Sequence, residues 1–403
     1  KLVRSATGPN KKPGGSEALH LESWDLSHLQ GRKGFLRIID WATGGWGHIN
    51  LDHIVLTDKN PPMILENASR TLTLKDQFLL IAIKNGATAK RVTLHVEGEA
   101  PVTNDVELAD GEADWHAVLD VSPWKGRQIK ITVDRLAEDS KALFSIRTSA
   151  EVGDESPYNE PLRGQFHFSP RRGWTNDPNG LVFYKGEYHL FFQHNPYGWG
   201  WGNMHWGHAV SPDLVHWKEL PIALFPDPAG TMFSGSAVVD WKNTSGLGQG
   251  GDPPMILLYT AAGSPFTQGL AFSQDGRRFA KWPRNPIIGR IENGDRDPKV
   301  FWHEPTQKWV MVLYLEIPGK PTLQILTSPD LKTWTPTSRV EGYHECPDLF
   351  ELPVQGTNGV RKWVITGANS DYQVGSFDGR VFTPETPILK GHQGRGFYAA
   401  QTF

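Results

Sequence analysis

The chain has 403 residues, more than one ordinary hydrophobic core requires, which favours two or three domains. Charged residues make up 21% of it and the net charge is −3, so the composition excludes a basic field for nucleic acid and an acidic solvating tail. The 16 Trp residues and the abundant Gly and Pro favour short strands joined by turns, with aromatic surfaces that suit a neutral partner such as a carbohydrate.

The cysteine count and the first residues of the chain limit the possible folds and cellular locations. A single cysteine, Cys346, excludes a disulfide within the chain, so the fold must rest on its hydrophobic core. No apolar run reaches the roughly 18 residues that a membrane helix needs. Residues 1–5 contain no apolar leader segment. We therefore expect no membrane partner.

The first part of the chain has the pattern of β modules without a catalytic cluster. Residues 1–66 are predicted to be the C-terminal part of a β-sandwich, because two strands, over 34–40 and 48–56, are too few for a stable sheet. Residues 67–150 are predicted to be a small all-β module, because alternation such as Arg-Val-Thr-Leu-His-Val is typical of a half-buried antiparallel strand. A polar linker is predicted over 151–162.

Residues 163–403 contain an internal repeat with a period of roughly 50–60 residues. Each unit holds about four short strands, with a Ser-x-Asp turn before the outermost strand, which is the signature of propeller blades. The innermost strands are predicted over 176–183, 233–239, 297–302, 345–352 and 397–403. The predicted fold is therefore all-β: a five-bladed β-propeller whose chain ends inside the fifth blade, preceded by β-sandwich-type modules.

An acid close to a proline opens three of the predicted innermost strands. Asp-Pro-Asn-Gly at 177–180 has the composition of a type I turn, and taken alone it favours a hairpin. Related motifs recur at Asp297 and Glu345. Because innermost strands line the axis of a propeller, we expect Asp177, Asp297 and Glu345 to meet at one mouth of the funnel. Two carboxyl groups across one bond are what glycoside hydrolysis requires, one as nucleophile and one as proton donor.

These motifs, in this order over about 163–403, resemble those of glycoside hydrolase family 32, the β-fructosidases that include invertases, levanases and inulinases. The matching stretches are Trp-Thr-Asn-Asp-Pro-Asn-Gly at 174–180, Arg-Asp-Pro at 296–298 and Glu-Cys-Pro at 345–347. The resemblance implies a five-bladed propeller followed by a β-sandwich. It also implies hydrolysis of terminal β-fructofuranosidic bonds in levan, inulin or sucrose, with retention of configuration and without a cofactor.

The resemblance assigns site residues position by position. It makes Asp177 the nucleophile and Glu345 the acid/base, and it gives Asp297 the role of binding sugar hydroxyls and stabilising the transition state. The positions that match the fructose subsite are Asn176, Gln193, Trp201, Phe233, Ser234, Arg296 and Tyr398. Many relatives carry Asp or Asn where this chain has Gly396, so no polar side-chain contact is expected from that position.

The same residues lead to electrostatic predictions. Arg296 beside Asp297 is expected to keep that carboxylate ionised. Glu345 must stay protonated near neutral pH to act as an acid, which requires burial or a negative neighbour, a role we assign to Asp177. Cys346 is interpreted as a small buried packing residue rather than a reactive thiol.

Several other functions compete with this hypothesis. His194, His205 and His208 suggest a metal site, but His205 and His208 lie three apart in one strand and should face opposite ways, so no metal is predicted. The stretch Gly-Gly-Trp-Gly-His-Ile at 44–49 resembles the closing part of sandwich domains fused to bacterial levanases, which leaves a sugar-binding role open. A non-catalytic fructan-binding protein and an arabinan- or xylan-cleaving propeller enzyme are the remaining alternatives. The three acids favour an enzyme over a binding protein. The Asn-Asp-Pro-Asn-Gly and Glu-Cys-Pro contexts oppose the arabinan- or xylan-cleaving enzyme.

The chain is also expected to be one part of a larger polypeptide. Residues 401–403 fall inside the predicted fifth-blade strand, and a propeller closes by packing its last blade against its first. We expect the remaining C-terminal part of the same polypeptide to supply the missing strands, and isolated 1–403 to expose apolar surface and show little activity. The resemblance further implies a secreted or cell-envelope location.

Overall fold

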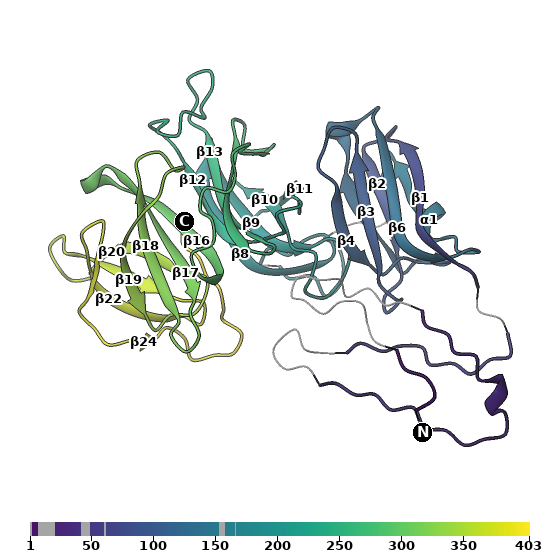
Figure 1. Cartoon of the computed structure of the whole chain (residues 1–403). Coiled ribbons are helices and arrows are strands. Elements are labelled where there is room, and N and C mark those ends of the chain that lie inside the picture. Colours follow the sequence, from purple (N-terminus) through teal and green to yellow (C-terminus); the bar gives the residue numbers. More distant parts are fainter. Residues whose placement is uncertain (1, 7–20, 42–48, 60–61, 153–157, 166) are drawn as a thin grey trace. The chain divides into compact units, whose positions relative to one another are not determined.

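The computed structural model describes residues 2–6, 21–41, 49–59, 62–152, 158–165 and 167–403. The chain divides into two compact units, Lys1–Asp154 and Glu155–Phe403 (Figure 1). In the described part of both units the regular secondary structure is mostly β-strand. No helix in the described part of the chain is long and apolar enough to cross a membrane.

The first unit is built on two antiparallel sheets. Their strand orders are β1-β6-β3-β4 and β5-β2-β7. The strands are β1 (Ile64–Thr73), β2 (Phe78–Ile83), β3 (Lys90–Val96), β4 (Val102–Val106), β5 (Trp115–Asp120), β6 (Gln128–Ala137) and β7 (Arg147–Ser149), with η2 (Ser122–Trp124) and α1 (Ala142–Ser145) between them. Buried Trp115, Ala117 and Leu119 alternate along β5, so this strand presents one apolar face to the core, as sheets stacked face to face require.

Residues ahead of β1 do not form the strands predicted for them. The structure has a short 3-10 helix, η1 (Ser27–Leu29), and no strand over 34–41 or 49–59. The two strand predictions are therefore wrong where the structure describes these residues. A strand needs a hydrogen-bonded neighbour, and two short segments alone do not make a stable sheet.

Part of the levanase-like sandwich motif, residues 44–48, lies outside the described residues. The same is true of 153–157, within the predicted linker. The assignments of 1–66 to a sandwich and of 151–162 to a linker stay predictions.

The second unit is a β-propeller of four-stranded antiparallel blades. Four sheets follow one another along the chain, each with its strands in sequence order. The first blade is β8 (Trp174–Tyr184), β9 (Glu187–Asn195), β10 (His205–Ser211) and β11 (Lys218–Leu224). The second is β12 (Thr231–Val239), β13 (Met255–Ala262), β14 (Phe266–Ser273) and β15 (Ala280–Lys281). The third is β16 (Asn293–His303), β17 (Lys308–Glu316), β18 (Thr322–Ser328) and β19 (Thr335–Glu341), with η3 (Glu304–Thr306) between β16 and β17. The fourth is β20 (Asp348–Pro353), β21 (Arg361–Thr366), β22 (Asp371–Phe377) and β23 (Phe382–Pro384), and β24 (Leu389–Lys390) pairs with β22.

This architecture confirms the predicted fold class, an all-β propeller preceded by β modules. Strand β12 lies between β8 and β16, as innermost strands of consecutive blades do. The predicted Ser-x-Asp turns precede the outermost strands. In three of them the serine hydroxyl, from Ser211, Ser273 or Ser328, donates to the aspartate two residues later.

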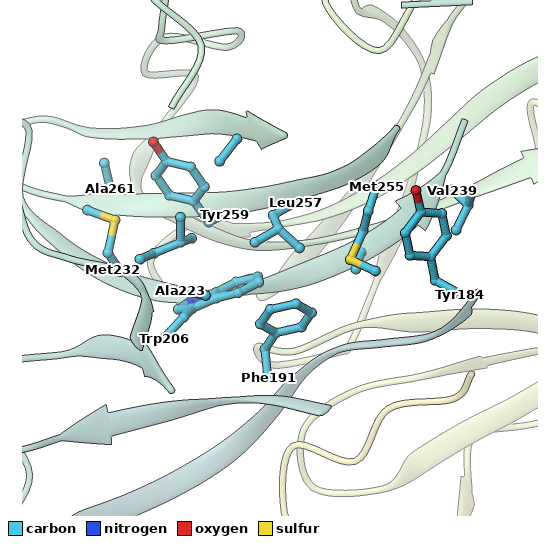
Figure 2. Close-up of a cluster of buried hydrophobic side chains, with 13 residues drawn as sticks. Tyr184, Phe191, Trp206, Ala223, Met232, Val239, Met255, Leu257, Tyr259 and Ala261 are labelled. Atoms are coloured by element: carbon cyan, nitrogen blue, oxygen red, sulfur yellow. The ribbon is translucent and has the colours of Figure 1, made fainter. Parts of the chain in front are cut away.

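Apolar side chains fill the space between successive blades. Figure 2 shows the first such cluster, in which Phe191 and Trp206 of the first blade lie near Met232, Leu257 and Tyr259 of the second. Similar clusters join the second blade to the third and the third to the fourth. Burial of one large apolar side chain contributes about 1.5–3 kcal/mol. The blade interfaces therefore hold the innermost strands, and the residues they carry, in fixed positions.

The innermost strand predicted over 397–403 is not formed as a strand. The segment is nevertheless attached to the axis: the Ala399 amide donates to the Ala368 carbonyl at 2.8 Å, and Gln401 Nε2 donates to the Gly235 carbonyl at 2.9 Å. A strand requires a ladder of backbone bonds with a neighbour, and the described residues offer this segment no such neighbour.

Candidate active site

Asp177 lies inside the innermost strand β8. The β8–β9 ladder shifts register twice, just before Pro178 and just after Asn179. Pro178 has no N–H to donate, and Gly180 adopts a φ of 53°. The hairpin interpretation of Asp-Pro-Asn-Gly is therefore wrong, because the motif makes irregularities within a strand. Such irregularities re-aim side chains, here that of Asp177.

The other two acids stand on left-handed backbone. Asp297, in β16, has a φ of 65°, and Glu345 and Cys346 have φ values of 45° and 38°. The predicted innermost strand of the fourth blade starts at Asp348 instead of Glu345, because this backbone and the missing N–H of Pro347 prevent pairing. Non-glycine residues in this region cost on the order of 1–3 kcal/mol each and gather at functional sites.

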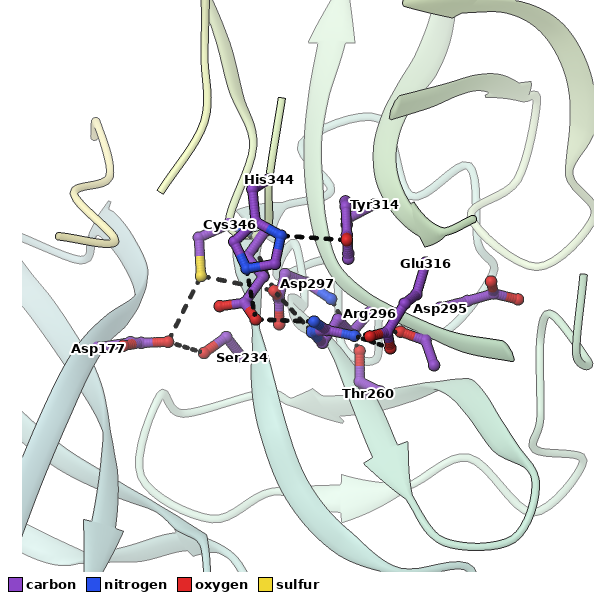
Figure 3. Close-up of polar contacts among 12 residues, drawn as sticks. Asp177, Ser234, Thr260, Asp295, Arg296, Asp297, Tyr314, Glu316, His344 and Cys346 are labelled. Atoms are coloured by element: carbon purple, nitrogen blue, oxygen red, sulfur yellow. Dashed lines mark hydrogen bonds and ion pairs between the residues drawn. The ribbon is translucent and has the colours of Figure 1, made fainter. Parts of the chain in front are cut away.

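The structure brings the three predicted acids together, and Figure 3 shows Asp177 and Asp297 beside Cys346. The sulfur of Cys346 lies 3.4 Å from Asp177 Oδ2 and 3.5 Å from Asp297 Oδ2. One oxygen of Asp297, one of Glu345 and this sulfur lie within 4.8 Å of one another. We call Asp177, Asp297 and Glu345 the acid cluster. Its members come from three blades and meet where the innermost strands converge.

Arg296 is the cation of the acid cluster. Its Nη2 donates to Glu345 Oε1 at 2.7 Å, and its Nη1 donates to Glu316 Oε2 at 2.9 Å. The guanidinium stands 4.7 Å from the centre of the Tyr314 ring and 3.9 Å from Asp297 Oδ2. The arginine therefore joins three carboxylates while its planar group is supported by an aromatic face.

The expectation that Arg296 keeps Asp297 ionised is wrong for this structure. Burial raises the pKa of Asp297 to about 7, and the charges of Asp177 and Glu345 act in the same direction. The Arg296 charge and the Cys346 amide, which donates to Asp297 Oδ2 at 3.0 Å, lower this pKa but do not outweigh burial. A carboxylate that is 5% exposed loses most of its hydration, which disfavours the charged form.

The expectation that Glu345 is held protonated is also wrong for this structure. Burial acts to raise its pKa, but the hydrogen bond and charge of Arg296, the Tyr398 hydroxyl and the neighbouring His344 imidazole lower it overall. Asp177 therefore does not decide the protonation of Glu345. The donors around the carboxylate do, because they bind its ionised form.

Asp177 has its own donors. Ser234 Oγ, which is buried, donates to Asp177 Oδ2 at 2.7 Å. Asn176 Nδ2 makes a longer contact of 3.3 Å with Asp177 Oδ1, and the side-chain oxygen Asn176 Oδ1 accepts from Trp174 Nε1 at 2.9 Å. Asn176 and Ser234 therefore contact the proposed nucleophile, and their role in the fructose subsite stays a prediction.

The remaining predicted subsite residues lie at different depths. Tyr398 is half exposed, and its hydroxyl donates to Glu345 Oε2 at 2.8 Å. Trp201 is 54% exposed and makes an edge contact with Phe233, with 5.9 Å between ring centres. Gln193 is buried and donates to the Met232 carbonyl at 2.9 Å, so its described bond holds β9 to the start of β12 instead of reaching an acid.

Cys346 is buried, as predicted, and packs with Ala368 and Ala399. Burial and the neighbouring charges of Asp297 and Asp177 raise the pKa of its thiol well above the ordinary value. The thiol is therefore neutral and lies in contact with the carboxylates of Asp177 and Asp297. Cys346 packs in the core and also lines the acid cluster.

The sequence analysis missed four residues around the acid cluster. Thr260 Oγ1 accepts the Asp297 amide at 3.0 Å, and Glu316 accepts from Arg296. His344 contacts both Glu345 and Tyr314. None of these residues belongs to a motif, and only His344, next to Glu345, could have been singled out by position.

The three histidines of the metal alternative have separate partners. His194 Nδ1 lies 2.8 Å from the Trp174 carbonyl, and His208 Nε2 lies 3.0 Å from His189 Nδ1. Burial lowers the pKa of His205 to about 3. The prediction of no metal stays a prediction.

Comparison with known proteins identifies the family. Residues 167–403, more than half of the chain, match the family described as "Glycosyl hydrolases family 32 N-terminal domain". The chain belongs to glycosyl hydrolase family 32. The expectation drawn from the three acid motifs is therefore confirmed at the level of the family.

Curated relatives and solved structures of family 32 share part of this chain. A levanase of Bacillus subtilis is 48% identical over 64% of this chain and 41% of its own length. An extracellular exo-inulinase of Aspergillus niger is 40% identical over 60% of this chain and 55% of its own. The β-fructofuranosidase of Schwanniomyces occidentalis complexed with fructosyl-erythritol is 40% identical, with a TM-score of 0.55, over 61% of this chain and 52% of its own. The chain thus spans about half the length of the relatives it matches.

Proposed function

We propose that this family 32 protein is an exo-acting β-fructofuranosidase that releases terminal fructose from fructans such as levan or inulin, and from sucrose. One observation carries the proposal: Asp177 and Glu345, from different blades, both reach the site that Asp297 and Arg296 share. The names of the similar levanase and exo-inulinase support fructan as the substrate class. The extracellular exo-inulinase also supports secretion.

In the first step, Asp177 attacks the anomeric carbon C2 of the fructosyl unit. The C2–O bond breaks, and the leaving oxygen takes a proton from Glu345, so that an ester joins Asp177 to fructose. Ser234 and Cys346 both contact Asp177 Oδ2. From the described residues Oδ1 has only the longer contact with Asn176, so we take it as the more nucleophilic oxygen.

In the second step, Glu345 removes a proton from water, the water oxygen bonds to C2, and Asp177 leaves. Arg296 and Tyr398 favour the ionised form of Glu345 that this step needs. For the first step Glu345 must carry a proton. Bound substrate would exclude water and so strengthen the burial effect that already acts to raise its pKa.

Asp177→Asn and Glu345→Gln test the two roles. Each variant should lower kcat/KM on sucrose and levan by several orders of magnitude with little change in Tm, since the substitutions remove transition-state stabilisation and leave the core intact. Asp252→Asn is the matched control, because its side chain is 60% exposed and bonded to Lys185 outside the acid cluster. Activity of Asp177→Asn within tenfold of wild type would rule out the nucleophile role.

The stereochemistry tests the double displacement separately. A covalent fructosyl-enzyme requires that the first fructose released keeps the anomeric configuration of the substrate. NMR spectra recorded in the first minutes of turnover check this, and the inverted anomer would contradict the mechanism. Binding of levan and inulin without sugar release would instead favour a non-catalytic fructan-binding protein.

A further inference from the structure

His344 and Tyr314 form a hydrogen-bonded pair that ends on Glu345. The His344 Nε2 atom lies 3.2 Å from Glu345 Oε1, and its Nδ1 lies 3.1 Å from the Tyr314 hydroxyl (Figure 3). Neighbouring residues of an extended chain point to opposite sides. The left-handed backbone at Glu345 and Cys346 changes this direction and lets the imidazole meet the carboxylate of the next residue.

We propose that His344, oriented by Tyr314, is a positioning residue that directs the catalytic proton of Glu345 to Oε2. The inference rests on the proposed acid/base role of Glu345. A tyrosine hydroxyl that donates to Nδ1 leaves the proton of a neutral imidazole on Nε2. Nε2 then donates to Glu345 Oε1.

The two oxygens of Glu345 therefore have different surroundings. Oε1 faces two N–H donors, from Arg296 at 2.7 Å and from His344. Oε2 faces the Tyr398 hydroxyl at 2.8 Å. A hydroxyl can turn and accept, whereas a guanidinium cannot. A proton on Glu345 is accordingly accommodated on Oε2, next to Tyr398, and that oxygen delivers it to the leaving group.

The charged and titratable groups around Glu345 come from several elements. Arg296 of β16 and His344 favour its ionised form, and the Asp297 and Asp177 carboxylates lie nearby. Behind them, Glu316 of β17 binds Arg296, and the Tyr314 ring supports the same guanidinium. Removing the His344 donor takes away one interaction that favours the carboxylate, so Glu345 should hold its proton to higher pH.

The test is the pH dependence of kcat/KM for the whole natural polypeptide and three variants. His344→Phe should move the alkaline limb, which reports loss of the Glu345 proton, upward by about half a pH unit or more. His344→Gln keeps an amide donor and should retain the wild-type limb. Tyr314→Phe keeps the ring beneath Arg296 but removes the hydroxyl that orients the His344 imidazole. It should therefore shift the alkaline limb in the same direction as His344→Phe, but by less. A uniform loss of activity in His344→Phe with an unmoved limb, or equal shifts in the Phe and Gln variants, would overturn the proposal.

A readout that does not need activity separates this inference from the proposed function. With ¹⁵N-labelled histidine, NMR should show His344 protonated on Nε2 and unprotonated on Nδ1, and Tyr314→Phe should weaken that preference. The opposite tautomer would overturn the inference even in an active enzyme. Wild-type protein that shows the expected tautomer but releases no fructose would instead refute the proposed function.

Discussion

Among single residues, Asp297 lowers the stability of the folded protein when its carboxylate is ionised. It is buried, it stands on left-handed backbone, and two other acids lie close to it. Arg296 and the Cys346 amide compensate only in part. The ionised form of Asp297 therefore lowers the stability of the fold, which fits its proposed role in binding a sugar.

Asp297→Asn should therefore increase stability while activity falls. The pKa of Asp297 is about 7 in the folded protein, above the ordinary 3.8, so the folded chain binds this proton more tightly than the unfolded chain. The stability contributed by the group is present below about pH 4 and is lost as the pH rises through 7. Asn cannot ionise, so the gain in the free energy of unfolding should grow from pH 4 to pH 8, on the order of 1–3 kcal/mol at the upper end.

Thermal melts at pH 4, 6 and 8 measure this effect. Asp252→Asn, an exposed carboxylate, is the control and should show no gain that grows with pH. A lower Tm of Asp297→Asn than of wild type at pH 8 would mean that the bonds of the carboxylate outweigh its burial.

At the scale of elements, β12 shows how closely the innermost strand must approach its neighbour. A Cβ at Gly235 would lie 2.0 Å from the Leu258 carbonyl oxygen, a backbone atom that cannot move aside without disturbing the strand. The β12–β13 ladder shifts register at this point, between Phe233 and Gly235. Ser234, which binds Asp177, lies in this irregular segment.

Gly235→Ala should lower both stability and activity. Overpacking of this kind costs typically about 1–3 kcal/mol, and the displaced backbone carries Ser234 away from Asp177. Gly289→Ala is the matched control, because a Cβ there meets nothing within 4 Å. Urea unfolding and kcat/KM measure the two effects, and a Gly235→Ala protein that matches the control in both would contradict the argument.

At the scale of the propeller as a whole, a buried ion pair ties distant segments together at the axis. Lys299 of the third blade lies 3.1 Å from Asp348 of the fourth, and both side chains are at least nine-tenths buried. Thr402 donates its amide and its hydroxyl to the same Asp348 oxygen, at 2.7 and 2.9 Å, and its carbonyl accepts from Lys299 at 2.8 Å. The pair thus attaches the segment 397–403, with Tyr398, to two blades.

Lys299→Met should destabilise the protein by about 3–5 kcal/mol, because it leaves the Asp348 charge buried without its partner. The double variant Lys299→Met/Asp348→Asn removes that charge and keeps an acceptor for Thr402, so it should recover much of the loss. Chemical unfolding of the two single variants and the double variant measures the coupling. A loss in the double variant equal to the sum of the losses in the two single variants would show that the pair is not coupled.

The all-β class, the blade repeat and the three acids could be predicted from the sequence, because turn chemistry and strand alternation depend on near neighbours in the chain. Asp177, Asp297 and Glu345 could be predicted to lie close together, because the innermost strands of a propeller share one axis. The pKa shifts of Asp297 and Glu345 and the contact of His344 with Tyr314 became visible in the folded structure. The same holds for the absence of strands over 34–41 and 49–59 in the described residues. These properties depend on burial, on donors from other blades and on strand partners, none of which a local pattern contains.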